Sequence, residues 1–280
     1  MALVTTAADV SAGKRTLADY ARLGWRDLEG GLRHWRLCYL MATGDMRRRF
    51  ARSKLGQVWI MLSSAIQVSA IGAVWSYLWH QPIEQMLPYI AISMMSWQFI
   101  SSVINDSTSA FSTSSNYFLN QHTFTSTIIY ASIYRNSITF LLNMVFPLLI
   151  CVAFGVTFSL RSFLSIAGLV IVVVALSWIS YAVAILCARF RDIAQIVASV
   201  LQIVFFITPV MWKPSLLPPE AQAVVDFNPF AAMLSIIRDP LLGAPVSLHL
   251  WAASSVLAFA GLFIALPFFG RFHRRVVYWL

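Results

Sequence analysis

Charged residues are scarce in this chain of 280 residues. Asp, Glu, Lys and Arg make up 11% of it, whereas soluble domains are about a quarter charged. Hydrophobic residues account for 59%, and the mean hydropathy is +0.73. A soluble domain of this size cannot bury that much apolar surface. The composition therefore excludes a soluble globular protein and predicts an integral membrane protein.

The sequence also lacks the motifs that carry catalysis or energy coupling. None of its twelve glycines begins a G-x-x-x-x-G-K-[ST] phosphate-binding loop. Cys38, Cys151 and Cys187 have neither metal-ligand nor paired spacing, and we find no metal-ligand cluster or nucleophile–base motif. The apolar stretches hold no Asp/Glu/His relay for proton coupling. We therefore expect no enzyme activity, no metal and no cofactor on this chain.

Six apolar stretches are long enough to cross the roughly 30 Å of hydrocarbon in a bilayer, which takes about 20 helical residues. They are Gln57–Trp79, Leu87–Phe111, Ile129–Phe158, Phe163–Ala188, Ile193–Met211 and Leu248–Phe269. The sequence therefore predicts an all-α, polytopic membrane protein with six transmembrane helices. Residues 1–54 form a cytoplasmic tail with an amphipathic helix, and residues 55–280 form one transmembrane domain.

Positive charge is concentrated on one side of these spans. Eleven of the 20 Lys and Arg residues precede the first span, and only Arg161, Lys213 and Arg238 fall on the side opposite to the termini. An excess of Lys and Arg marks cytoplasmic loops, so both termini are predicted to be cytoplasmic. Anionic lipid headgroups then explain the net charge of +9, and no nucleic acid is required. Residues 1–13 lack the apolar core of a signal peptide, and we expect them to be retained.

The segment before the first span has the pattern of a helix lying in the membrane interface. One face at helical spacing is apolar and aromatic, and arginines surround the rest. The apolar face consists of Leu17, Tyr20, Trp25, Leu28, Leu32, Trp35 and Tyr39, and the arginines are Arg22, Arg26, Arg33 and Arg36. Gly30 and Gly31 each weaken a helix by about 1 kcal/mol relative to Ala, which allows a break there. Such a helix serves either as an anchor or as a gate or docking element.

Two connecting segments are unusual. The polar stretch Ser112–Thr127, on the cytoplasmic side, is either a solvated loop or a short helix that docks a soluble partner. Its candidate docking residues are Asn116, Tyr117, Asn120, Gln121 and His122. On the outer side, Met211–Leu248 holds several prolines and apolar pieces too short to span. It is either a plain loop or a re-entrant hairpin of short helices, which is tolerated where protein covers the backbone.

Four of the spans carry a polar face. Amides, hydroxyls and aromatic rings recur there at helical spacing, and polar groups in hydrocarbon need a reason to be present. The candidate path-lining residues are Ser64, Gln67, Trp75, Trp79, Trp97, Ser132, Asn136, Asn143, Gln195, Ser199, Gln202 and Phe206. Such faces either line a path for a neutral, hydroxyl-rich solute or hold helices together through hydrogen bonds. The sequence leaves both interpretations open.

Short motifs occur in a characteristic order between Arg49 and Phe230. They are Arg49–Gly56 followed by Trp59, Ser96–Phe99, Arg189–Ile193 with Gln202 and Thr208–Val210, and Asn228–Phe230. In order and spacing this set resembles the membrane (permease) subunits of ABC exporters for bacterial cell-surface polysaccharides, such as O-antigen, capsule and teichoic acid. Phe50 stands where that family usually has Tyr, and Gln121–Thr125 departs from its Lys and Phe-Pro pair.

The resemblance implies a homodimer of six-helix subunits in the bacterial cytoplasmic membrane, bound to two ATPase subunits that hold ATP and Mg. It implies that residues 116–127 and the interface helix face the ATPases, and that residues 211–243 form short re-entrant helices near the pore exit. The exported substrate is then a lipid-linked or capped polysaccharide. A permease for a small amphiphile (a drug or lipid) and a non-transporting scaffold are the alternatives.

A basic cluster leads into the first span. Its members are Arg47, Arg48, Arg49, Arg52 and Lys54. Arg binds phosphate through its forked donors, so the cluster suits the pyrophosphate of a lipid carrier at the inner leaflet. A positive-inside topology signal explains the same residues equally well.

Overall fold

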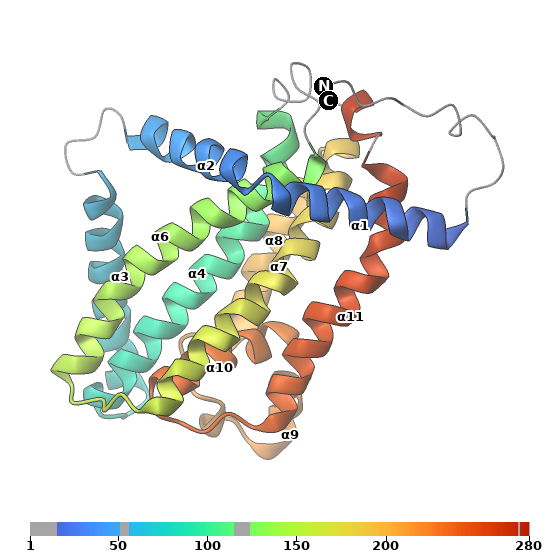
Figure 1. Ribbon diagram of the computed structural model, residues 1–280. Coiled ribbons are helices and arrows are strands. Elements are labelled where there is room, and N and C mark those ends of the chain that lie inside the picture. The colour runs from blue at the N-terminus through green and yellow to red at the C-terminus, as the bar shows by residue number, and fades with distance from the viewer. Residues whose placement is uncertain (1–15, 51–55, 115–123, 274, 280) are drawn as a thin grey trace, which may run out of the picture.

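The computed structural model describes residues 16–50, 56–114, 124–273 and 275–279, and this part of the chain is all-α (Figure 1). The α-helices are α1 (Leu17–Arg33), α2 (Trp35–Phe50), α3 (Gln57–Leu78), α4 (Ile83–Thr113), α6 (Thr125–Ala153), α7 (Leu164–Arg189), α8 (Ile193–Ile207), α9 (Pro219–Asp226), α10 (Pro229–Leu241) and α11 (Leu248–Phe272). The 3-10 turns are η2 (Leu160–Phe163), η3 (Pro214–Leu216) and η4 (Val276–Tyr278).

Five of these helices are long and apolar enough to cross a membrane: α3, α4, α6, α7 together with η2, and α11. The predicted class, an all-α multi-pass membrane protein, is therefore confirmed. Helix α8 is apolar but has 15 residues, fewer than the expected span Ile193–Met211. It ends at Ile207 because Thr208, in extended conformation, precedes Pro209, and the residue before a proline is disfavoured in a helix.

Helix α6 begins four residues and ends five residues earlier than the expected span Ile129–Phe158. Its end is set by Gly155, whose φ of +73° is available to glycine without strain. The backbone nitrogen of Val156 donates to the carbonyl of Cys151, and that of Gly155 donates to Val152. These two bonds satisfy carbonyls that the last turn of the helix leaves free.

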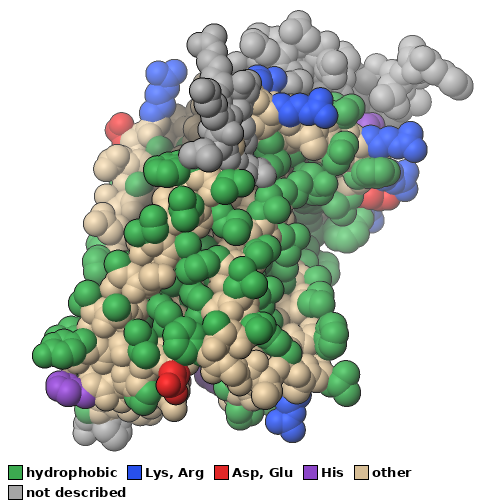
Figure 2. Space-filling view, turned by 90° about the vertical axis from the view of Figure 1, so that its left-hand side faces the viewer, with side chains coloured by type: hydrophobic (Ala, Val, Ile, Leu, Met, Phe, Trp, Pro, Cys, Tyr) green, Lys and Arg blue, Asp and Glu red, His purple; other side chains and the backbone are tan. Residues whose placement is uncertain are grey.

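Helix α4 lies at the centre of the bundle. Helices α3, α6, α7, α8 and α10 all pack on it, and most of its apolar stretch is buried. Helices α1 and α2 lie across one end of the bundle, which we call the α1/α2 end, and α9 and α10 lie toward the opposite end (Figure 1). Figure 2 shows hydrophobic side chains over much of one face, with Lys and Arg gathered toward the α1/α2 end. This distribution suits a bundle that stands in a membrane.

Candidate functional site

Helix α1 is held by a face that the apolar pattern did not reveal. Thr16 and Asp19 form a capping box at its start. Leu17, Trp25 and Leu32 of the predicted apolar face are exposed, whereas Leu28 of that face is buried. The residues buried against the bundle are Gly24, Asp27, Leu28, Gly30 and Gly31. The helix is therefore amphipathic in two senses, with one apolar face outward and a face of small residues and a carboxylate inward.

Glycines let α1 approach α11 at backbone distance. A Cβ placed on Gly24 would lie 2.3 Å from the carbonyl oxygen of Leu266, and one placed on Gly270 would lie 1.8 Å from that of Tyr20. Real Cβ atoms do not come this close to backbone oxygens, so side chains at both positions would force the helices apart. Only glycine on each helix permits this crossing.

Further along α1, Gly30 and Gly31 face the start of α6. A Cβ on Gly30 would meet the ring of Phe124 at 2.5 Å, and one on Gly31 would meet the hydroxyl of Ser126 at 2.2 Å. The sequence allowed a helix break at this glycine pair. The helix instead continues through it to Arg33, and the change of direction comes at His34, between α1 and α2. The glycines serve close packing rather than a break.

Asp27 joins α1 to the first turn of α6. Its carboxylate accepts hydrogen bonds from the backbone nitrogens of Thr125 at 3.1 Å and Ser126 at 3.0 Å, and from the hydroxyl of Tyr181 on α7 at 2.7 Å. The Ser126 hydroxyl donates to the Asp27 carbonyl at 2.6 Å. The N-cap residue Phe124 has no side-chain acceptor, so Asp27 supplies the cap from another helix, where a negative charge also suits the helix dipole. We call Asp27, Thr125, Ser126 and Tyr181 the Asp27 cluster.

Asp27 is 4% exposed, so its charge is compensated almost entirely by these donors. The sequence did not reveal this role, because a carboxylate that directly follows Arg26 on an amphipathic helix looks like a solvated ion-pair partner. The only signal was the inward spacing of Gly24, Asp27 and Gly31, at steps of three and four residues.

A second cluster joins α2, α4 and α6. Arg135 on α6 donates to Asp45 on α2 and to Asp106 on α4, both at 2.8 Å, and the Asn136 amide donates to Asp106 at 2.8 Å. Arg48 on α2 also pairs with Asp45. The side chains of Arg135, Asp45 and Asp106 are partly exposed, and they line a cavity of about 130 Å³. We call Asp45, Asp106, Arg135 and Asn136 the Arg135 cluster.

The two clusters lie on either side of one connection. Helix α4, with Asp106 near its end, stops at Thr113, and α6 starts at Thr125 beside Asp27. The predicted docking residues Asn116, Tyr117, Asn120, Gln121 and His122 are in this connection and lie outside the described residues. Helix α1 is thus tied to the start of α6, and α2 is tied through Arg135 to positions further from the connection on α6 and α4.

A buried arginine organises the opposite end. The Arg238 guanidinium on α10 donates to the Pro209 carbonyl at 2.9 Å and to Asp239 at 2.6 Å, and it lies 4.2 Å from the centre of the Tyr89 ring. The Tyr89 hydroxyl donates to the carbonyls of Pro209 and Trp212. This network ties α4 and α10 to the segment after α8. The sequence identified Arg238 only as one of the few basic residues on the outer side and did not predict this network.

The candidate path-lining residues fall into two groups. Ser64, Trp97, Ser132, Asn136 and Asn143 lie mainly inside the subunit. Trp97 is 7% exposed and packs against Phe205 and Phe230, with ring centres 5.8 and 5.9 Å away. Asn136 and Asn143 line a small cavity between α4 and α6 together with Gln98. These positions suit helix–helix adhesion within one subunit.

The second group lies toward the surface. Its members are Gln67 and Trp75 on α3, Trp79 directly after α3, and Gln195, Ser199, Gln202 and Phe206 on α8. All are exposed except Trp75, which is partly buried and stacks on Trp79 with ring centres 5.9 Å apart. Of the basic cluster, Arg47 and Arg48 are exposed at the end of α2, while Arg52 and Lys54 lie outside the described residues, as does the side chain of Arg49.

Most of this chain is similar in sequence to known proteins. Residues 36–242 match the family model described as ABC-2 type transporter. The O-antigen export system permease protein RfbA of Myxococcus xanthus is 23% identical over 231 residues, which cover 76% of this chain and 87% of that protein. The protein of the same name from Klebsiella pneumoniae is 18% identical over 242 residues, which cover 85% of this chain and 91% of that protein.

Proposed function

Since this chain belongs to the ABC-2 type transporter family and is its non-catalytic membrane subunit, we propose that it exports a polysaccharide with the help of a separate ATPase subunit. ATP and Mg are held by that partner, and the substrate is a lipid-linked or capped cell-surface polysaccharide of the O-antigen type. The names of the distant relatives support this substrate class. The observation that carries the proposal is the attachment of α1 to the start of α6, together with that of α2 through Arg135 to α6 and α4, on the helices that flank the connection.

In this proposal the ATPase docks on that connection, at residues 116–122, from the cytoplasm. A displacement there pulls on the first turn of α6 and on the end of α4. The Asp27 cluster passes the movement to α1 and α7, and the Arg135 cluster passes it to α2. Because packed helices shift as rigid bodies rather than bend, a small movement at the docking segment displaces whole helices of the bundle.

A second copy of the chain covers α8 in our proposal. Gln195, Ser199 and Gln202 are exposed along this apolar helix, and Leu201 is its one buried residue. Amides facing lipid leave their hydrogen-bonding groups without partners, which is costly. A homodimer with a polar path between the α8 helices supplies partners or water for them, and Gln67 of α3 faces the same path.

The topology is also part of the proposal. Helix α8 leaves the end of α7 and reaches the carbonyls that Tyr89 binds at the start of α4, so it runs through the depth of the bundle. Its 15 residues extend for about 22 Å. This supports a sixth crossing, with both termini in the bacterial cytoplasm. Helices α9 and α10 then form the re-entrant pair near the pore exit, where Arg238 holds α10 in place.

In our proposal the basic cluster attracts the substrate. Arg47 and Arg48 are exposed at the end of α2, beside the Arg135 cluster. Together with Arg49, Arg52 and Lys54 they attract the pyrophosphate of the lipid carrier to the inner leaflet, since Arg pairs with phosphate through forked donors.

The test of function is ATP hydrolysis by the purified permease–ATPase complex in liposomes, together with surface glycan in cells. We expect the permease to stimulate hydrolysis and Gln202→Ala to lower surface glycan, with Val256→Ala on the exposed face of α11 as a control without effect. A complex whose ATPase rate is unchanged by the permease would identify a scaffold. Normal surface glycan with reduced drug resistance would identify a permease for small amphiphiles.

The dimer has its own test. Ser199→Cys should be joined to its counterpart in a second copy by a bis-maleimide cross-linker, because equivalent positions on α8 face one another across the proposed path. Val256→Cys, on an exposed face of α11, should not. The native cysteines are buried and give little background. Equal cross-linking at both positions would contradict an interface through α8.

A further inference from the structure

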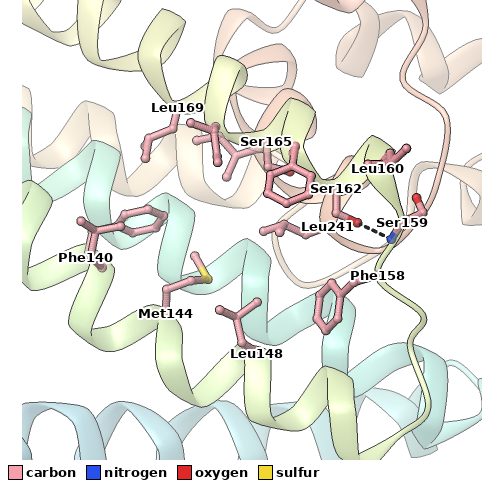
Figure 3. A pocket seen from close by; sticks show the side chains of 14 residues that line it. Phe140, Met144, Leu148, Phe158, Ser159, Leu160, Ser162, Ser165, Leu169 and Leu241 are labelled. Atoms are coloured by element: carbon pink, nitrogen blue, oxygen red, sulfur yellow. Dashed lines mark hydrogen bonds between the residues drawn. The ribbon is translucent and has the colours of Figure 1, made fainter.

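A groove lies between α6 and α7 (Figure 3). Both helices pack more extensively on α4 than on one another, which leaves a cavity of about 730 Å³ between them. Its walls come from α6, α7, the η2 turn and α10. Figure 3 shows Ser162, Ser165 and Leu169 across the groove from Phe140, Met144 and Leu148. The volume is within the roughly 300–1,000 Å³ of ordinary ligand sites.

The groove is apolar and elongated. It follows α6 from Leu148 to Phe140, a distance of about 12 Å at the rise of an α-helix. It starts at η2, where the membrane-spanning stretch Leu160–Arg189 begins, and runs from there toward the middle of the bundle. Apolar side chains form nearly all of the lining, and Leu141 and Ile166 are well exposed beside it. At this depth the occupant is a hydrocarbon chain rather than water.

Hydroxyl groups lie where the groove meets the η2 turn. Ser159 and Ser162 cap that turn reciprocally. Ser165 lines the groove one turn further along; it is 6% exposed, and its hydroxyl has no hydrogen-bond partner within the described part of the chain. A buried hydroxyl without a partner costs about 1–3 kcal/mol. The Ser165 oxygen is itself covered, so a ligand that turns the covering side chains aside and brings a carbonyl oxygen to it removes this cost.

A positive charge stands at the same turn. Arg161 is exposed in η2 between the capping serines, and among the described residues it makes no ion pair. The other cations of this end are engaged, Arg238 with Asp239 and Lys213 over the Tyr89 ring. Arg161 is therefore the cation available to an anion at the mouth of the groove, and guanidinium groups suit phosphate.

These features occur in the order of a phospholipid: phosphate, ester carbonyl, acyl chain. We propose that the groove binds one acyl chain of an anionic diacyl phospholipid of the leaflet opposite to the α1/α2 end. Arg161 binds the phosphate, Ser165 donates to the ester carbonyl, and the chain fills the groove from η2 to Phe140. The lipid wedges between α6 and α7 where they do not pack on each other. This site is separate from the proposed polar path on α3 and α8.

The experiment uses the purified full chain in nanodiscs of phosphatidylcholine containing a trace of phosphatidylglycerol with a photoactivatable acyl chain. Peptide mapping should find the cross-links in residues 140–148 and 158–169. Ile166→Trp fills the groove and should abolish them. Val170→Trp is the matched control, because Val170 is 58% exposed against 60% for Ile166, lies on the same helix and does not line the groove.

Two further variants test the polar contacts. Arg161→Gln should reduce labelling by the phosphatidylglycerol probe by about tenfold, the loss expected for one charge-assisted contact. It should reduce labelling by a phosphatidylcholine probe less, because the choline cation already offsets the charge of that phosphate. The wild type should label more strongly with an ester-linked probe than with its ether-linked counterpart. Ser165→Ala should remove this difference.

Labelling that is equal in Ile166→Trp and Val170→Trp, or that is spread evenly over the exposed faces of α6 and α7, would show ordinary lipid-facing surface and overturn the proposal. So would a polyprenyl lipid recovered from the groove in place of a phospholipid. If Ile166→Trp does not give a monodisperse protein, Leu141→Trp on α6 fills the groove from the other side and should abolish the cross-links. Val145→Trp, which does not line the groove, is its control. Every readout is binding, so the outcome does not depend on export activity.

Discussion

The carboxylate of Asp27 caps the first turn of α6, where it accepts a hydrogen bond from the backbone nitrogen of Ser126 at 3.0 Å, although 99 residues separate the two along the chain. The same carboxylate accepts from Tyr181 on α7. One side chain thus holds the surface helix α1, the start of α6 and helix α7 in a fixed arrangement. A contact of this kind explains how α1 moves with the bundle rather than independently of it.

Asp27→Ala should lower the free energy of unfolding by about 3 kcal/mol, because it removes a helix cap and leaves buried donors without an acceptor. Thermal unfolding in detergent measures the loss, and ATPase stimulation in the complex should fall with it. Glu29→Ala is the control on the same helix. Its exposed pair with Arg33 contributes little, so the two variants must differ for this role of Asp27 to hold.

Gly270→Ala should separate α1 from α11, since the added methyl group meets the Tyr20 carbonyl oxygen. Strain of this kind costs about 1–3 kcal/mol. Limited proteolysis should cut α1 faster in the variant, and the melting temperature should drop. Gly44→Ala in α2 has open space at its Cβ and should be neutral or slightly stabilising. A Gly270→Ala protein as stable as Gly44→Ala would refute the close crossing.

Arg135→Ala should destabilise the protein by about 1–2 kcal/mol, because Asp45 and Asp106 lose the cation between them. The effect should shrink when Asp106→Asn is added, which removes one of the uncompensated charges. Melting curves of the two single variants and the double variant form the cycle that measures the coupling. Arg47→Ala, at an exposed position on α2, serves as the control, and additive single effects would count against the cluster.

Arg238→Met should be the most damaging of these changes, at about 3–5 kcal/mol, because breaking a buried pair leaves Asp239 without its cation. Tyr89→Phe keeps the ring over which Arg238 lies and removes only the hydroxyl bonds to Pro209 and Trp212. It should cost about 1 kcal/mol. Expression level and melting temperature of the two variants, measured side by side, check this order.

The thiol of Cys38 should react slowly with maleimide in the folded protein. Burial raises its pKa above the ordinary value, so the reactive thiolate is rarer at pH 7 than for an exposed cysteine. Labelling should accelerate as the pH rises toward that higher pKa, because the fraction of thiolate increases. Mass spectrometry of timed samples measures the rate, and rapid labelling at pH 7 would show that Cys38 is not shielded by α1 and α6.

The hydrophobic pattern predicted the spans well because membrane crossing demands long apolar runs. The first span was expected at Gln57–Trp79 and is a helix over Gln57–Leu78, and the last was expected at Leu248–Phe269 and extends to Phe272. The motifs around Arg49, Arg189 and Asn228 predicted the family correctly. Errors lie at helix ends, where local features such as Gly155 and Pro209 decide the boundary.

The candidate site was harder to predict, for a physical reason. Asp27 binds backbone nitrogens, which every residue except proline carries, so no partner side chain marks the pairing in the sequence. Gly270 and Gly24 matter through what they lack, and their partner atoms are carbonyls. Polar faces on the spans were recognised, but periodicity cannot tell whether Asn136 faces a path or Asp106; only the packing of α4 on α6 decides it.

The glycine crossing of α1 and α11 also bears on how the protein is made. Gly24 leaves the ribosome early, whereas its partner Gly270 follows 246 residues later, which takes about 12–50 s at ordinary rates of synthesis. During that interval α1 has an apolar face but no helix to receive its glycine face, so it must wait at the membrane surface. Completion of the last helix closes the contact, and a truncated or stalled chain therefore exposes α1 to proteases.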